Sequence, residues 1–390
     1  MNVQNLIAKY KSIGIITLSL LVGAIITFIA LPFLTRLYSV HDFGEYGVVL
    51  ALVSVLSTIA NLRLDQAQLI AKEEDQKKLI FEGFIISLLF CIITAIILIY
   101  FFNLNMIVAI SFGILSNTLV QCLYNYKFSR EEELFCAGLN IFRSLVVVFV
   151  QLVLPSFLSI SLINSYTISS ILIIFVVIAY ILVNQLYNVS WRSFKNYKDF
   201  IFSNTPHALL NSFSHNLPYY IVSHFIGYQA VGYYSIVERT LRLPINLMSQ
   251  TIRQYYIRKF KKESSVEDVL RNSIFLSVIS LPFFVVFFVL PESFYLMIFG
   301  KEWIGISIYF KILALGYWAV FCNPPSSAYL IAKRESNILL KLQIIELIFK
   351  FLLFIFLFFT FANKIYLLLA VPFSLIFYNF SILYIVRRRS

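Results

Sequence analysis

The sequence predicts an all-α integral membrane protein with about twelve transmembrane helices, arranged as two parallel six-helix bundles. Three observations support this fold class: the composition, a series of long apolar runs, and a short motif that occurs twice. Hydrophobic residues make up 60% of the 390 residues and charged residues 13%, whereas soluble proteins have about 25% charged residues. With a mean hydropathy of +0.85, the chain has too few polar residues to cover the surface of a soluble fold.

The apolar runs are about 20 residues long, which is the length that an α-helix needs to cross a bilayer. Charged or turn-rich segments separate them. The runs of the first half cover approximately residues 12–35, 43–64, 79–101, 104–126, 134–157 and 160–185. Those of the second half cover approximately residues 200–226, 232–255, 272–291, 304–331, 338–361 and 365–386.

The repeated motif relates the two halves. Residues 42–46 (DFGEY) lie between the first two apolar runs, and residues 230–234 (AVGYY) lie at the same place in the second half, 188 residues later. Basic residues around Lys72 and Lys259 follow at about the same spacing. We therefore expect an N-terminal bundle over residues 1–190 and a C-terminal bundle over residues 191–390. Because six is even, both enter the membrane from the same side, as parallel repeats with a cavity on their seam.

Loop charges set the expected orientation. Twenty Lys and Arg residues lie in the loops of one predicted side, and three, Arg36, Lys301 and Lys364, lie on the other. Loops rich in Lys and Arg remain in the cytoplasm. The sequence therefore predicts that both termini are cytoplasmic.

The same charges argue against nucleic-acid binding, although the net charge is +12, because they occupy short loops between apolar runs. The longest loops, near residues 186–199 and 256–271, have about 15 residues and cannot hold a folded domain. The chain has no HExxH, GxSxG, CxxC or Gly-rich phosphate motif, and its four cysteines lack metal-ligand spacing. We therefore predict neither an enzyme nor a bound cofactor.

Arg143, Arg239 and Arg242 lie near the middle of predicted spans. Each would cost about 2.5–3.5 kcal/mol in lipid, so we expect them to face a water-filled cavity. Glu238 has the i,i+4 spacing to pair with Arg242, but it cannot neutralise all three arginines. Lys311 is a further candidate for the cavity.

Other charges have simpler explanations. Arg63, Arg253 and Lys341 lie near inner span ends, where long side chains reach the interface, although Arg63 is also kept as a candidate for substrate binding. Glu346 and Lys350 have the i,i+4 spacing of an internal ion pair.

The span over residues 200–226 has one polar helix face. His207, Asn211 and His215 recur every four residues, with Asn216 beside them. We expect this face to bind polar ligand groups, and proton transfer by the histidines is the less favoured interpretation. Breaks within spans, as in transporters that rock or bend, are predicted at Pro206, Pro218, Pro244, Pro282 and the pair Pro324-Pro325.

Residues 34–46 read LTRLY and then DFGxY. This motif and two others resemble motifs of the Wzx-type O-antigen and polysaccharide flippases of the MATE-like exporter superfamily. The second, Gly232-x-Tyr234 leading through Arg239 to Pro244, is similar to the eighth span of that family. The third, residues 299–303 (FGxxW), is similar to the approach to its tenth span. The resemblance extends from about residue 10 to residue 385.

The resemblance implies that the two bundles form a V-shaped central cavity in the bacterial inner membrane. Such a protein carries undecaprenyl-pyrophosphate-linked oligosaccharide repeat units, of O-antigen or capsule, from the cytoplasmic to the periplasmic leaflet by alternating access. The three mid-span arginines would bind the pyrophosphate, because the forked donors of Arg match phosphate oxygens. His207, Asn211 and Asn216 would meet the sugars, and membrane lipids and other polysaccharide assembly proteins are further expected partners.

Two alternatives remain open. The first is a MATE-like small-molecule exporter, although the first span has no acidic residue for proton coupling. The second is a membrane polysaccharide polymerase or ligase, which usually has a large periplasmic loop that this chain lacks.

Overall fold

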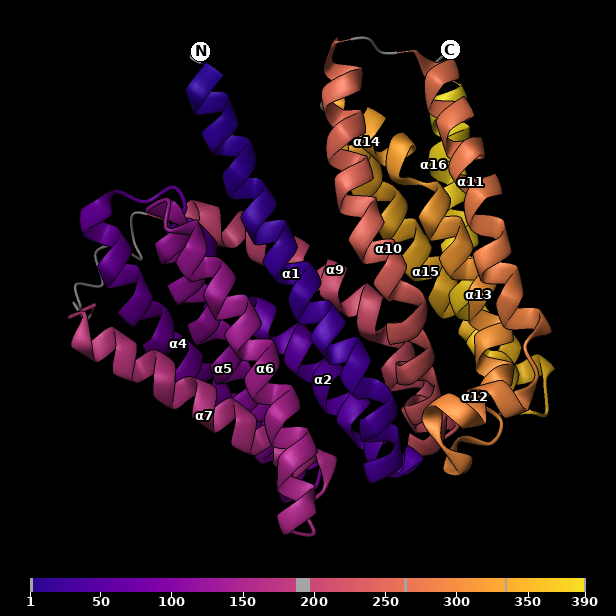
Figure 1. Cartoon of the computed structure of the whole chain (residues 1–390), viewed down its shortest axis with the longest axis horizontal. Coiled ribbons are helices and arrows are strands. Elements are labelled where there is room, and N and C mark those ends of the chain that lie inside the picture. Colours follow the sequence, from indigo (N-terminus) through magenta and orange to yellow (C-terminus); the bar gives the residue numbers. More distant parts are fainter. Residues whose placement is uncertain (1–2, 187–196, 263–264, 334, 389–390) are drawn as a thin grey trace. The chain divides into compact units, whose positions relative to one another are not determined.

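The computed structural model describes residues 3–186, 197–262, 265–333 and 335–388, and all regular secondary structure in these residues is helical (Figure 1). In the first half, the helices are α1 (Val3–Leu37), α2 (Val40–Ala60), α3 (Leu64–Ala67), α4 (Glu73–Leu98), α5 (Leu104–Ser129), α6 (Glu133–Phe157) and α7 (Leu162–Val183). They are followed by α9 (Lys198–Phe225), α10 (Tyr228–Lys262), α11 (Val266–Val289), α12 (Glu292–Phe299), η1 (Lys301–Trp303), α13 (Ile306–Cys322), α14 (Pro324–Ala332), α15 (Ser336–Thr360), η2 (Lys364–Leu369) and α16 (Ala370–Arg387).

Each of the twelve predicted spans coincides with one long helix or with two consecutive helical segments. In the part of the chain that the structure describes, ten of them are long and apolar enough to cross a membrane. The other two are α9 and α10, whose side chains are described only in part. The chain is thus an all-α integral membrane protein, as predicted. The expected boundary between residues 190 and 191 and most of the loop 186–199 lie outside the described residues.

The first compact unit, which we call unit 1, comprises Met1–Asn216. Its central helix is α5, which packs against α2, α4, α6 and α7. Gly113 permits this packing, because a Cβ atom there would lie 2.7 Å from the Tyr166 hydroxyl and 2.8 Å from Val53 Cγ2. The fourth spanning helix of the chain is therefore the core of unit 1.

The second compact unit, unit 2, comprises Leu217–Ser390. Its central helix is α13, which packs against α10, α11 and α16. At Gly316 a Cβ atom would lie 2.5 Å from Pro372 Cα of α16. Because α13 belongs to the fourth span of the second half, both units are built around the same helix of the predicted repeat.

The prolines interrupt the helices less than expected. A break occurs at the Pro324-Pro325 pair, where α13 ends at Cys322 and α14 begins at Pro324. Pro244 and Pro282 lie inside α10 and α11 instead, and α9 continues through both of its prolines. The predicted breaks at these positions are wrong, because neighbouring helices in a membrane bundle satisfy the backbone groups that a proline leaves unbonded.

The repeated motif begins a helix in both units. Ser39 is the N-cap of α2, and its side chain and that of Asp42 form a capping box. α10 begins at Tyr228, 188 residues after Val40, the first residue of α2. Gly227 precedes it with a φ of 113°, a backbone conformation that favours glycine. The two halves thus enter their second span at equivalent positions by different local means.

The third motif, residues 299–303, shapes the turn between α12 and α13. Gly300 and Gly305 have φ values of 105° and 96°, and the Trp303 side chain between them is fully buried. The amide of Gly305 donates a hydrogen bond to Glu292 Oε1 at 2.7 Å. This motif therefore has a structural role at the entrance to α13.

Candidate functional site

The candidate site is a polar pocket inside unit 1, with a volume of about 630 Å³. Drug-sized ligands occupy pockets of about 300–1,000 Å³. Helices α1, α2, α5, α6 and α7 supply its walls. The lining residues are Ser19, Leu20, Gly23, Ala24, Thr27, Tyr46, Leu50, Val53, Ser54, Ser57, Asn117, Asn140, Arg143, Ser144, Val147 and Tyr166.

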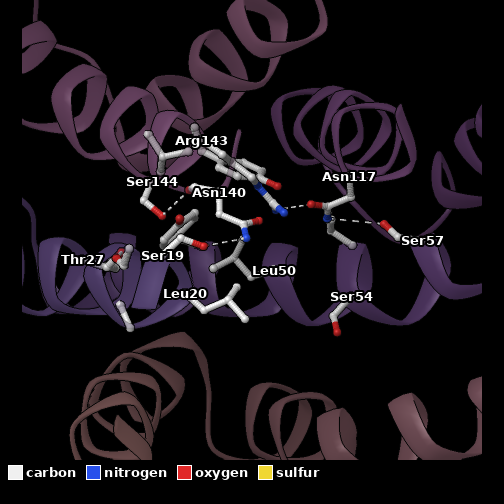
Figure 2. A pocket seen from close by; sticks show the side chains of 16 residues that line it. Ser19, Leu20, Thr27, Leu50, Ser54, Ser57, Asn117, Asn140, Arg143 and Ser144 are labelled. Atoms are coloured by element: carbon white, nitrogen blue, oxygen red, sulfur yellow. Dashed lines mark hydrogen bonds between the residues drawn. The ribbon is translucent and has the colours of Figure 1, made fainter. Parts of the chain in front are cut away.

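Arg143 is the charged residue among these lining residues. Its Nη2 donates a hydrogen bond to Asn117 Oδ1, and Asn117 Nδ2 donates to Ser57 Oγ at 3.5 Å. Figure 2 shows the Arg143 and Asn117 side chains pointing toward each other, with Ser57 beyond Asn117. Residues from α6, α5 and α2 therefore form a chain of hydrogen bonds that fixes the guanidinium group.

A second polar group joins α1 to α6 in the same pocket (Figure 2). Asn140 Nδ2 donates to Ser19 Oγ at 3.3 Å, and Ser144 Oγ donates to the Asn140 carbonyl at 3.2 Å. At Gly23 a Cβ atom would lie 2.7 Å from Ser144 Oγ, so glycine allows α1 to approach α6 here. These contacts place hydroxyl and amide groups along one wall of the pocket.

The polarity of the lining restricts the ligand. None of the described lining residues is Asp, Glu, Lys or His, so a cationic ligand would find no carboxylate and would be repelled by Arg143. The serine, threonine and asparagine side chains can both donate and accept hydrogen bonds. The pocket therefore suits a ligand that carries hydroxyl groups and a negative charge.

Of the polar residues predicted on α9, Asn216 contacts the pocket lining. Asn216 Nδ2 donates to Ser54 Oγ at 3.3 Å, and Ser212 Oγ donates to the Ser54 carbonyl at 3.2 Å. Asn211 and His215 are exposed, and they do not line the pocket. The side chain of His207 lies outside the described part of the structure.

The two mid-span arginines of the second half lie in unit 2, on α10. Arg242 Nη1 forms an ion pair with Glu238 Oε1 at 3.0 Å, which confirms the predicted i,i+4 pair. The Tyr219 hydroxyl donates to the other oxygen of Glu238, and the rings of Tyr219 and Tyr234 meet edge to face at 4.9 Å. Arg242 is therefore neutralised within unit 2, and Arg239 lies one turn before it on the same helix.

Arg63 and Lys311 lie elsewhere. Arg63 precedes α3 with a φ of 61°, and its amide donates to Asn61 Oδ1 at 3.1 Å. Burial raises the pKa of the adjacent Asp65, and the nearby Arg63 guanidinium and hydrogen bonds from Asn61 and the backbone oppose that shift. Lys311 is exposed on α13. The structure thus places neither cation in the unit 1 pocket.

Glu346 and Lys350 form the predicted ion pair on α15, with Lys350 Nζ 2.7 Å from Glu346 Oε1. Their side chains are 7% and 5% exposed, so both charges are inside unit 2 and away from lipid. This pair has a structural explanation, because each charge neutralises the other in a medium of low dielectric constant.

Most lining residues other than Arg143 were missed by sequence reasoning. A signal was present: Ser19, Gly23 and Thr27 recur every four residues in the first span, and Asn140 and Ser144 have the same spacing in the fifth. Small polar residues also mediate ordinary packing of membrane helices. The sequence alone therefore could not separate pocket walls from helix contacts.

No metal site accompanies the pocket in the described ranges, where no group of three or more His, Cys, Asp or Glu residues is placed to hold an ion. The four cysteines are buried and free.

The comparison with family profiles matches residues 33–308 to a family described as polysaccharide biosynthesis protein. The match covers more than half of the chain and includes α2 to α12, and the chain belongs to this family. The comparison with curated proteins yields no match.

Solved structures with a similar fold are MATE transporters and related proteins. A transporter of the MOP superfamily from Pyrococcus furiosus has a TM-score of 0.62 and 12% identity, with coverage of 97% of this chain and 95% of that one. A mutant of the Vibrio cholerae MATE transporter VcmN has a TM-score of 0.55, 12% identity, and coverage of 97% and 96%. An inward-facing multidrug resistance MATE transporter has a TM-score of 0.63, 12% identity, and coverage of 95% and 93%. The chain therefore shares the fold of these transporters over nearly its whole length, and its family is that of polysaccharide biosynthesis proteins.

Proposed function

We propose that this protein is a flippase that moves undecaprenyl-pyrophosphate-linked oligosaccharide repeat units from the cytoplasmic to the periplasmic leaflet by alternating access. The family supports a role in polysaccharide biosynthesis, and the fold supports transport across a membrane. The observation that carries the proposal is the unit 1 pocket, which combines hydroxyl and amide groups with one arginine.

The pocket lining favours this function over export of cationic drugs. A cationic ligand in a membrane cavity is best held by carboxylates, and none is present among the described lining residues. The Pyrococcus furiosus transporter is described as having a binding pocket of reverse polarity, which is taken to suggest a different function for that protein. A pocket with a single positive charge in this chain supports an anionic, hydroxyl-rich ligand.

The membrane potential assists outward movement of an anion. An inside-negative potential favours it by roughly 2.3 kcal/mol per charge per 100 mV. An arginine in the pocket lowers the barrier to entry, because charge-assisted hydrogen bonds replace part of the lost hydration. Coupling to an ion gradient is therefore not required by this mechanism.

Removal of the protein from its host tests the proposal. Cells that lack a flippase lose the surface polysaccharide, including single repeat units, and accumulate lipid-linked units in the inner membrane. Loss of a polymerase instead leaves single units attached at the surface. Loss of a small-molecule exporter leaves the polysaccharide intact and changes drug sensitivity. Either of the last two outcomes would contradict the proposal.

A further inference from the structure

We propose that the unit 1 pocket takes the saccharide part of the ligand, and that Arg143 pairs there with a single acidic substituent on a sugar. This inference rests on the proposed function and names the substrate class of the same pocket. The competing possibility is that Arg143 binds the pyrophosphate of the lipid carrier. Three features of the pocket bear on this choice, and the second and third distinguish the two ligands.

The first feature is the restraint on Arg143. Asn117 accepts a hydrogen bond from Arg143 Nη2, and Asn117 is itself oriented by its bond to Ser57. A guanidinium has five N–H donors in a planar fork. One of the two Nη2 hydrogens is engaged by Asn117. The guanidinium therefore retains one free face, meaning here one in-plane edge, from which two N–H groups can donate parallel hydrogen bonds. That face matches a single carboxylate or a single phosphate group.

The second feature is the charge balance. Arg143 supplies one positive charge, and none of the other fifteen described lining residues carries a charge. A pyrophosphate linkage has a charge on each of its phosphate groups, so it would leave a negative charge uncompensated in a half-buried pocket. One carboxylate on a sugar would be neutralised in full.

The third feature is the number of hydroxyl oxygens that can accept hydrogen bonds from the ligand. Apart from Arg143 and its two supports, the pocket presents the side chains of Ser19, Thr27, Ser54, Asn140 and Ser144. The hydroxyls of Ser19, Thr27 and Ser144 donate to backbone carbonyls of their own helices, so their oxygens remain to accept hydrogen bonds from sugar hydroxyls. A pyrophosphate offers acceptors alone and would leave these groups poorly matched.

Asn117 is a positioning residue in this scheme. Its side-chain oxygen accepts a hydrogen bond from Arg143 Nη2 and so fixes the orientation of the guanidinium in the pocket (Figure 2). Loss of its side chain should therefore weaken the binding of an acidic sugar and leave a neutral sugar unaffected. A purely structural role would not produce that selectivity.

The test is equilibrium binding to the purified full-length protein in detergent. The probes are methyl glucuronide, methyl glucoside and inorganic pyrophosphate. We expect methyl glucuronide to bind about tenfold more tightly than methyl glucoside, a difference of about 1.4 kcal/mol. Arg143→Gln should abolish the difference and Asn117→Ala should reduce it severalfold. Lys341→Gln, which changes an exposed cation outside the pocket, should leave it unchanged.

Two results would overturn the inference. One is equal affinity for glucuronide and glucoside in the unchanged protein. The other is tight binding of pyrophosphate that Arg143→Gln removes, which would assign the pocket to the carrier. Either result would leave the proposed function intact if cells without the protein still lose their surface polysaccharide. Conversely, selective glucuronide binding with normal polysaccharide in those cells would refute the proposed function alone.

Discussion

Equivalent faces of α2 in unit 1 and α10 in unit 2 have different roles. In unit 1, Tyr46, Leu50 and Ser54 of α2 line the polar pocket. The residues 188 positions later are Tyr234, Glu238 and Arg242 of α10, and the last two of these form an ion pair with each other. The tyrosine is buried in both units and meets another tyrosine edge to face, at 5.4 Å from Tyr166 in unit 1 and 4.9 Å from Tyr219 in unit 2.

This difference shows that an arginine inside the membrane is not by itself a ligand site. Arg143 is bound by the neutral oxygen of Asn117 and keeps its positive charge available. Arg242 is bound by a carboxylate that is itself 8% exposed. The equivalent helix face therefore lines a pocket in unit 1 and carries an ion pair in unit 2, in which the Glu238 side chain is 8% exposed and that of Arg242 is 30% exposed.

Introduction of an ion pair like that of Glu238 and Arg242 into the unit 1 pocket should have the largest effect on surface polysaccharide. In the variant Leu50→Glu with Ser54→Arg, the new side chains have the i,i+4 spacing of Glu238 and Arg242 and would occupy the pocket. We expect surface polysaccharide to be nearly abolished while the protein remains in the membrane. Leu50→Met with Ser54→Thr, which keeps both side chains uncharged and retains the hydroxyl at residue 54, is the matched control and should retain function. Normal polysaccharide with the introduced pair would show that the pocket does not bind substrate.

Disruption of the buried pair on α15 should have the next largest effect, on stability. Lys350→Met leaves the Glu346 carboxylate buried and uncompensated, at a cost of about 3–5 kcal/mol. The protein level in membranes should fall sharply and should recover in the double variant with Glu346→Gln. These levels can be compared by immunoblot after thermal challenge. A double variant no better than the worse single variant would mean that the two residues act separately.

A smaller effect is expected at the hydrogen bond between Tyr219 and Glu238. Tyr219→Phe removes a donor to a buried carboxylate, which should cost about 1.5–3 kcal/mol of stability. Because Tyr219 does not line the unit 1 pocket, substrate transport per molecule should be unchanged. The thermal unfolding midpoint in detergent and the polysaccharide formed per protein molecule would be measured together. A loss of transport without a loss of stability would place this cluster in the transport cycle.

The smallest effect on function is expected from single cysteine substitutions in loops. Labelling of these cysteines tests whether equivalent loops of the two units face the same side of the membrane. With the native cysteines replaced, an impermeant thiol reagent on whole cells should modify cysteine at Asn105 in unit 1 and at Gln229 in unit 2. It should spare cysteine at Arg130 and at Lys333. All four positions are exposed. Labelling of opposite sides in the two units would refute the parallel arrangement and the predicted direction of transport.

The sequence was sufficient to predict the spans and the ion pairs, because both depend on local spacing. Apolar runs of bilayer length correspond to helices, and the i,i+4 spacing placed Glu346 beside Lys350 and Glu238 beside Arg242. The proline breaks were predicted poorly. Whether a proline interrupts a membrane helix depends on neighbours that satisfy the freed backbone groups, and these are not visible in one sequence.

The pocket was predicted only in part for a related reason. Arg143 was identified by the cost of a charge at mid-span. Its partners Asn117 and Ser57 come from two other helices, α5 and α2, and they meet only in the folded bundle. Arg242 met the same criterion as Arg143. Its neutralisation depends on Tyr219 of α9 as well as on Glu238, which no spacing rule could have shown.

The central claim is that Arg143 acts on the ligand and that Arg242 acts within the fold. The most direct test is the surface polysaccharide per molecule of membrane protein in two variants expressed in cells that lack the native protein. Arg143→Gln should lower it about tenfold or more, because a charge-assisted bond to the ligand contributes about 1.5–3 kcal/mol. Glu238→Gln combined with Arg242→Gln removes the unit 2 pair without an unpaired charge and should retain most of the activity. Normal polysaccharide with Arg143→Gln, together with its loss in the double variant, would contradict the claim.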